Sequence, residues 1–72
     1  MDFRPLLGLV AEINKLKSLL QSDSANTSYL NQIAINYLQM GNQPGAALYL
    51  HRSLAVEADN NIAKGLKEEY QL

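Results

Sequence analysis

Apolar residues recur along this chain at intervals of three and four, the spacing of one face of an α-helix. Four such segments can be drawn, and polar turns rich in glycine, asparagine and serine separate them. No stretch alternates apolar and polar residues with the β-branched enrichment typical of a strand. The pattern therefore predicts an all-α fold of four helices, and a length of 72 residues predicts one domain, residues 1–72.

The first predicted helix, residues 5–21, has the longest apolar seam. Pro5 suits the first turn of a helix, where its missing N–H is not needed. The seam follows 3-4-3-4 spacing through Leu6, Leu9, Ile13, Leu16 and Leu20. We expect this helix to pack against the segments that follow. A chain of this size buries a small core, so part of the seam could instead pair with a second copy. The candidate residues for self-association are Leu9, Ile13 and Leu16.

Two helices are predicted in the middle of the chain, over residues 27–40 and 44–58. Asn26 can cap the first by accepting a hydrogen bond from a free backbone N–H. Gly41 can adopt the left-handed conformation that ends a helix, and Pro44 can begin the next one. The two helices should therefore run antiparallel. After a turn rich in capping residues, a last helix is predicted within residues 61–72, with Ile62, Ala63, Leu66 and Tyr70 as its apolar positions.

The middle pair resembles one repeat of the tetratricopeptide family. Thr27 to Asn60 spans 34 residues, which is the period of that family. Small residues stand where two helices would approach closely, at Ala34 and Ala46. The other positions that follow the family pattern are Leu30, Ile33, Tyr37, Gly41, Leu50, Ser53 and Leu54. Leu30 replaces a large aromatic residue and Ala58 replaces a proline, so the copy is divergent.

The resemblance implies a tetratricopeptide-like hairpin at residues 27–60, with an N-terminal packing helix and a C-terminal capping helix. Ala63, Leu66 and Tyr70 follow Leu30, Ile33 and Tyr37 by 33 residues and echo the first half of a repeat. Lys67 then stands where Ala34 stood, which indicates a polar outer face. A fragment of a longer array is an open alternative.

In this family the first helix of each repeat lines a binding groove. The corresponding partner-binding residues would be Asn31, Ile35, Leu38 and Gln39, with Ser28 beside them. This face has no lysine or arginine, which disfavours capture of a peptide carboxylate. We expect a groove that prefers an apolar or amphipathic helix. The alternative is that the first predicted helix packs against Ile35 and Leu38, or that one of them is simply an exposed apolar residue.

Amino-acid composition and charge disfavour several classes of function. The net charge is −1 and the charges are scattered, which disfavours nucleic-acid binding. The chain has no cysteine, which excludes a disulfide scaffold and a thiolate zinc site. The apolar run Leu6–Ala11 is too short to span a bilayer, so we expect no membrane partner and a cytoplasmic location.

Catalytic chemistry is not indicated. His51 and Ser53 lie two residues apart on a predicted helix, so their side chains diverge. No carboxylate spacing suggests a metal site, and no phosphate-binding glycine motif suggests a cofactor. We expect a non-catalytic protein–protein interaction module, an adaptor or chaperone-type helix binder. The alternative is a structural protein that forms a homodimer through the seam of the first helix.

Overall fold

A computed structural model describes residues 4–72, with side chains placed from Leu7 onward. Within this part the chain forms four α-helices and no strand: α1 (Arg4–Leu20), α2 (Thr27–Gln39), α3 (Gln43–Val56) and α4 (Asn61–Tyr70). The all-α class is confirmed, and each helix begins and ends within two residues of its predicted limit. The side chain of Leu6, the first residue of the predicted seam, lies outside the described part.

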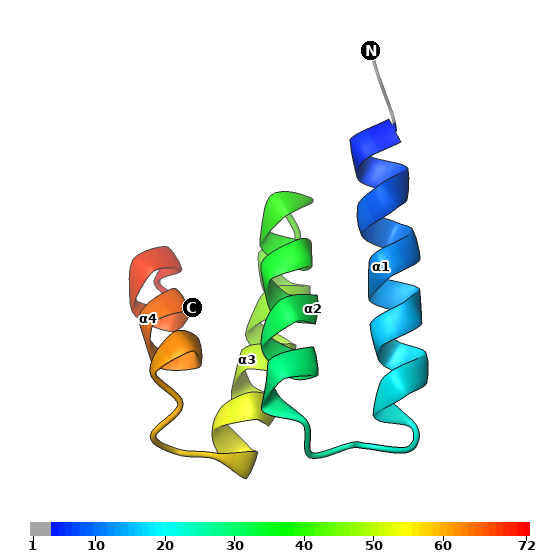
Figure 1. The fold of residues 1–72 in the computed structure, drawn as a ribbon. Coiled ribbons are helices and arrows are strands. Elements are labelled where there is room, and N and C mark those ends of the chain that lie inside the picture. Colours follow the sequence, from blue (N-terminus) through cyan, green and yellow to red (C-terminus); the bar gives the residue numbers. More distant parts are fainter. Residues whose placement is uncertain (1–3) are drawn as a thin grey trace.

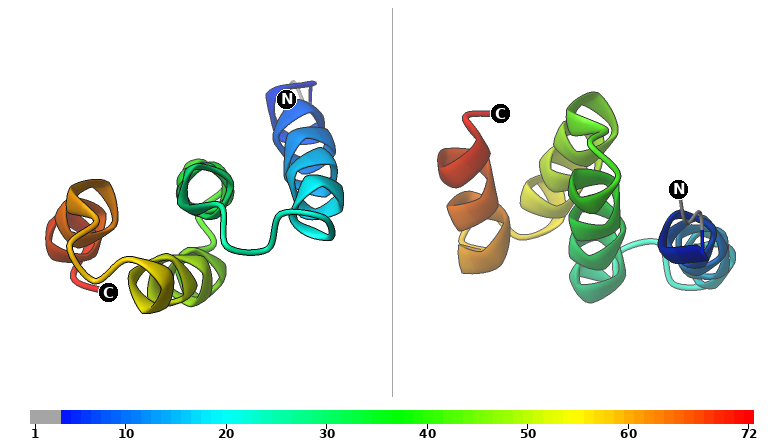
Figure 2. Two further views of the ribbon diagram at one scale, coloured as in Figure 1. Left: turned by 60° about the horizontal axis from the view of Figure 1, so that its bottom comes forward. Right: turned by 90° about the horizontal axis from the view of Figure 1, so that it is seen from above.

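Successive helices run in opposite directions (Figure 1). α2 lies between α1 and α4, with α3 behind it, as two further views also show (Figure 2). The main contacts join α1 to α2, α2 to α3 and α3 to α4, which are neighbours in the chain. The Cα envelope measures 39 × 30 × 15 Å, so the molecule is thin in one direction and every helix has a face at the surface.

Asparagine side chains cap the N-terminal ends of three of the helices. Asn26, Asn42 and Asn60 each accept a hydrogen bond from the backbone N–H three residues later, at 3.1, 3.0 and 2.9 Å respectively. Each bond satisfies an N–H that the first helical turn leaves without a partner. These caps explain why the breaks fall at the polar turns of the sequence.

The turn between α2 and α3 depends on two glycines. Gly41 has φ 78°, a left-handed conformation that side chains with a Cβ rarely adopt. It lets the Asn42 N–H donate to the Tyr37 carbonyl at 2.8 Å. A Cβ at Gly45 would lie 3.1 Å from Cγ of Tyr37. Gly41 permits the left-handed turn, and Gly45 leaves room for the Tyr37 ring. Both glycines are therefore needed for α2 and α3 to be joined this closely.

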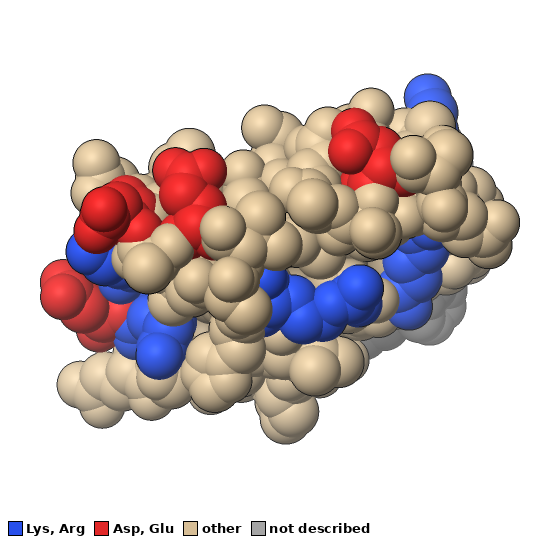
Figure 3. Space-filling view, turned by 90° about the horizontal axis from the view of Figure 1, so that it is seen from below, with Lys and Arg blue, Asp and Glu red and all other residues tan. Residues whose placement is uncertain are grey.

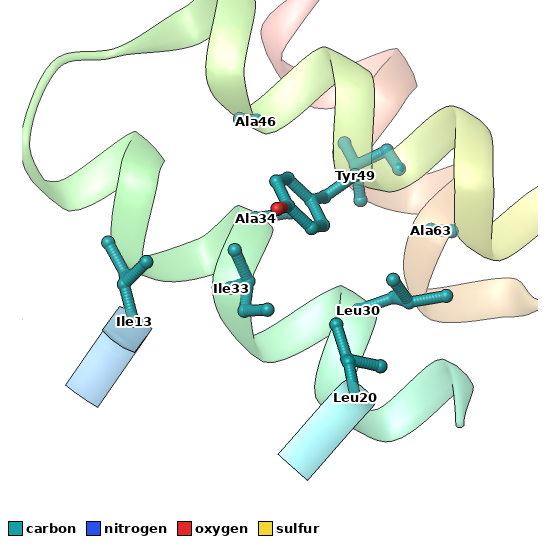
Figure 4. Packing of buried hydrophobic residues seen from close by; sticks show 9 residues of the cluster. Ile13, Leu20, Leu30, Ile33, Ala34, Ala46, Tyr49 and Ala63 are labelled. Carbon is teal, nitrogen blue, oxygen red and sulfur yellow. The ribbon is translucent and has the colours of Figure 1, made fainter. Parts of the chain in front are cut away.

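The core lies where α2 meets α1 and α3 (Figure 4). Leu30, Ile33 and Ala34 of α2 are at most 1% exposed, as are Ala46 and Leu50 of α3. All five stand at positions of the tetratricopeptide pattern given above. The remaining buried apolar residues are Ile13 and Leu20 of α1, Tyr49 of α3 and Ala63 of α4.

The buried face of α3 includes a residue that the sequence pattern did not indicate. Tyr49 is 8% exposed, whereas Ala47 is only half-buried. Tyr49 lies near Lys17 of α1. The helix ends at Val56, two residues before its predicted limit, because Glu57 takes an extended conformation with φ −140° and ψ 96°.

Candidate interaction surfaces

The predicted partner-binding residues of α2 lie in different environments. Ile35 is half-buried and is not part of the core cluster, and Gln39, one turn later, is exposed. Leu38 is half-buried and packs against the core. Ile35 and Gln39 therefore lie on the open side of α2, and Leu38 lies at its edge. Their role in binding a partner stays a prediction.

Asn31 does not lie on an open groove, and this expectation was wrong. Its side chain is 5% exposed, and its Nδ2 donates to Oδ1 of Asn60 at 3.0 Å. The same Asn60 oxygen accepts from the Ala63 N–H, so one atom caps α4 and holds it to α2. The Oδ1 of Asn31 is buried without a partner. Asn31 is thus a structural contact between helices.

The predicted self-association seam is largely used within the chain. Ile13 is 3% exposed and belongs to the core, and Leu16 is half-buried against it. Leu9 is half-exposed. The expectation that Ile13 is free to meet a second copy was wrong, because it already packs in the α1–α2 contact. On the outer side of α1, Leu7 is 65% exposed and Val10 is 38% exposed.

α1 packs against the side of α2 that carries the buried cluster. Leu20 of α1 points toward Leu30 of α2 within this cluster (Figure 4). Ile33 belongs to the same cluster, whereas Ile35, two residues later, lies about 200° around the helix. Leu38 packs against the core, and coverage of Ile35 by the first helix stays an open alternative.

α4 covers one end of the hairpin. Ala63 is fully buried and Leu66 packs against the core. Both positions match the predicted similarity of this helix to the first half of a repeat. Tyr70 is 40% exposed and Ile62 is 59% exposed, so the echo is incomplete. Lys67 is half-buried. Among the described side chains the one ion pair lies at this end, between Lys64 and Asp59 at 3.6 Å.

The residues considered for catalysis do not meet. His51 is exposed, while Ser53 is fully buried and its hydroxyl has no hydrogen-bond partner. Among residues 4–72, no three His, Cys, Asp or Glu side chains converge in a way that could hold a metal ion. In the same range no helix is both long enough and apolar enough to cross a bilayer.

A cluster of cationic and aromatic side chains that the sequence did not predict lies where α1, α2 and α3 meet. The Nζ of Lys17 lies 5.5 Å from the centre of the Tyr37 ring and 5.9 Å from that of Tyr49. A signal for this contact was present. Lys17 follows Ile13 by four residues and precedes Leu20 by three, so it lies beside the buried stripe of its helix.

Comparisons with protein-family models, with curated proteins and with solved structures found no match to this chain.

Proposed function

We propose that this protein is a non-catalytic interaction module that binds an amphipathic helix of another protein along α2. The observation that carries the proposal is Ile35, a half-buried apolar side chain on the central helix that is not part of the core cluster. A binding helix would place its apolar residues on Ile35 and on the edge of Leu38, while Gln39 would contact its polar side.

The position of α2 suits this role. α1 and α3 pack against its other sides, and the Asn26 cap and the Gly41 turn define its two ends. A surface held rigid in this way loses little conformational entropy when a partner binds. One stripe of α2 consists of Ser28, Gln32, Ile35 and Gln39. None of these residues is charged, so electrostatics favours neither an anionic nor a cationic peptide on this stripe.

The resemblance to the tetratricopeptide family supports the same proposal. In that family the first helix of a repeat lines the groove, and α2 occupies the matching place in Thr27–Asn60. The proposal includes a cytoplasmic adaptor or chaperone-type role, in which the module holds a helix of its partner.

A selection experiment tests the proposal without an identified partner. A displayed library of helical peptides is selected against the folded protein, and enriched peptides are titrated by fluorescence anisotropy. We expect apolar residues at i, i+3, i+4 and i+7 in the enriched peptides. Ile35→Asp should weaken their binding about tenfold or more, since it places a charge where an apolar contact forms.

Leu48→Asp is the matched control. Leu48 is 57% exposed on α3, so the control introduces the same charge at an exposed apolar residue away from α2. Circular dichroism must show that both variants keep their helical content. Selection that enriches no helical pattern, or affinity that Ile35→Asp and Leu48→Asp lower equally, would mean that α2 is not the binding surface.

A further inference from the structure

A pocket of about 240 Å³ lies between α1 and α3, away from the open side of α2. Its lining is Lys17, Leu20, Gln21, Tyr49 and Arg52. Leu20 and Tyr49 are buried and form its apolar wall, whereas Lys17 and Arg52 are exposed. The pocket thus has an apolar wall and two cationic side chains that come from different helices.

Aromatic rings hold both cations in place. The guanidinium carbon of Arg52 lies 5.0 Å from the centre of the Tyr49 ring, and the Lys17 ammonium lies 5.9 Å from the same centre. The Tyr37 ring, tilted by 34° at 5.8 Å from that of Tyr49, gives Lys17 its second aromatic neighbour. Cations at these distances are attracted to the ring faces. The two side chains are therefore positioned before any ligand arrives.

Neither cation has an anionic partner among the described side chains. The one ion pair there joins Lys64 to Asp59 at the opposite end of the molecule, and no carboxylate lines the pocket. On the face drawn in Figure 3, Lys and Arg side chains lie side by side in the middle, and most of the visible Asp and Glu side chains gather at one end. Hydrogen bonding to Tyr37 raises the pKa of Lys17 above its ordinary value, which favours its charged form.

We propose that this pocket recognises a carboxylate of an acidic peptide, held between the Lys17 ammonium and the Arg52 guanidinium. Arginine binds carboxylates through a planar pair of N–H donors, and lysine adds a point charge. The carboxylate source is either an acidic side chain or a free C-terminus. Leu20 and the Tyr49 ring would contact an apolar residue next to it.

The end of α1 favours a carboxylate over a phosphate. Lys17, Leu20 and Gln21 lie at the C-terminal end of this helix, where backbone carbonyls give a partial negative charge. The Gln21 N–H and the Ser22 N–H already bond to carbonyls of the last turn, which lessens but does not remove this field. A singly charged group is repelled less there than a phosphate that carries nearly two charges.

The pocket is independent of the surface proposed on α2. Tyr37, which borders the cation cluster, and Ile35 are two residues apart and lie on different faces of the helix. The Ile35→Asp variant should therefore bind an acidic peptide as the unaltered protein does. A negative result for the α2 surface would therefore not contradict the pocket, and a negative result for the pocket would not contradict the α2 surface.

Nuclear magnetic resonance titration of the ¹⁵N-labelled protein tests the pocket. The probe is a short peptide of alternating glutamate and leucine with both ends blocked. A second peptide has glutamine in place of glutamate, and a third is the glutamine peptide with a free C-terminus. We expect saturable shifts of the Lys17, Gln21 and Arg52 amides with the first peptide and none with the second. Shifts with the third would show that a terminal carboxylate also fits.

Lys17→Gln and Arg52→Gln should each weaken binding about tenfold, the order expected for one hydrogen bond to a charged group. Both residues are exposed, so the variants should fold normally. Lys15→Gln is the matched control, because it removes the same charge from α1 at an exposed position outside the pocket.

Four results would overturn the proposal. The first is equal binding of the glutamate and glutamine peptides. The second is equal weakening by Lys15→Gln and Lys17→Gln, which would indicate only a general charge effect. The third is tighter binding of inorganic phosphate than of the glutamate peptide. The fourth is self-association in sedimentation that Lys17→Gln abolishes, since the occupant would then be a second copy of the chain.

Discussion

Asn60 connects the start of α4 to α2, and its replacement by alanine should destabilise the protein far more than its position in a turn suggests. Its side chain is 8% exposed, and the Oδ1 atom accepts from the Ala63 N–H at 2.9 Å and from Asn31 Nδ2 at 3.0 Å. Asn60→Ala removes both bonds. It also leaves the Asn31 amide, which is 5% exposed, with no partner.

The two losses differ in size. Loss of an asparagine N-cap costs about 1 kcal/mol. A buried donor left without a partner costs about 2 kcal/mol more. The expected decrease in the free energy of unfolding is therefore about 3 kcal/mol. Asn31→Ala alone should be close to neutral, because it also removes an Oδ1 that is already buried without a partner.

The double variant Asn31→Ala, Asn60→Ala separates the two effects. With both amides gone, only the cap is lost, and the cost should fall to about 1 kcal/mol. Urea unfolding followed by circular dichroism gives these values if the slope with denaturant stays constant. An osmolyte such as trimethylamine N-oxide can be added equally to all samples if Asn60→Ala is partly unfolded in buffer.

Asn61→Ala is the matched control. Asn61 is exposed at the first position of α4, so its loss should change stability by less than about 0.5 kcal/mol. If Asn60→Ala is as mild as this control, or if adding Asn31→Ala recovers none of its cost, the Asn31–Asn60 contact does not hold α4 as argued.

Further predictions concern single residues of α2–α4, each measured by the same unfolding assay. Gly65→Ala should stabilise by about 0.5–1 kcal/mol, because a Cβ there meets nothing within 4 Å and alanine favours a helix. Gly41→Ala should destabilise by about 1–2 kcal/mol despite equal space, because its φ is 78°. Equal effects of the two changes would contradict the assigned turn geometry. Ser53→Ala should be neutral or stabilise by up to about 1 kcal/mol, since its fully buried hydroxyl has no partner. A clear loss of stability would mean that the hydroxyl does form a hydrogen bond in solution.

Helix positions could be predicted from the sequence because their limits are set locally. The caps at Asn26 and Asn60 and the left-handed turn at Gly41 involve residues within five positions of one another. The burial of Leu30 and Leu50 also follows from helical spacing alone. Such signals are contained in short segments, so one sequence is enough to detect them.

The environments of Asn31 and Tyr49 could not be predicted in this way. An asparagine is usually exposed, and Asn31 is buried only because Asn60, 29 residues later, offers its side-chain oxygen. Tyr49 is buried because α1 packs near it, and the pocket beside it depends on the angle between α1 and α3. The spacing of Lys17 beside the apolar stripe of α1 indicated a contact with neighbouring helices. Its partners, Tyr37 and Tyr49, lie on those other helices and could not be identified from the spacing.

The packing of each helix against its neighbour in the chain has a consequence for how the protein folds. The interfaces α1–α2, α2–α3 and α3–α4 each close over a single short turn, which gives the fold a low contact order. Helical proteins of this kind fold within about microseconds to milliseconds. The α2–α3 hairpin can form from its own local contacts before α4 packs against it. α4 then adds to a surface already in place, and its attachment is complete once Asn60 reaches Asn31.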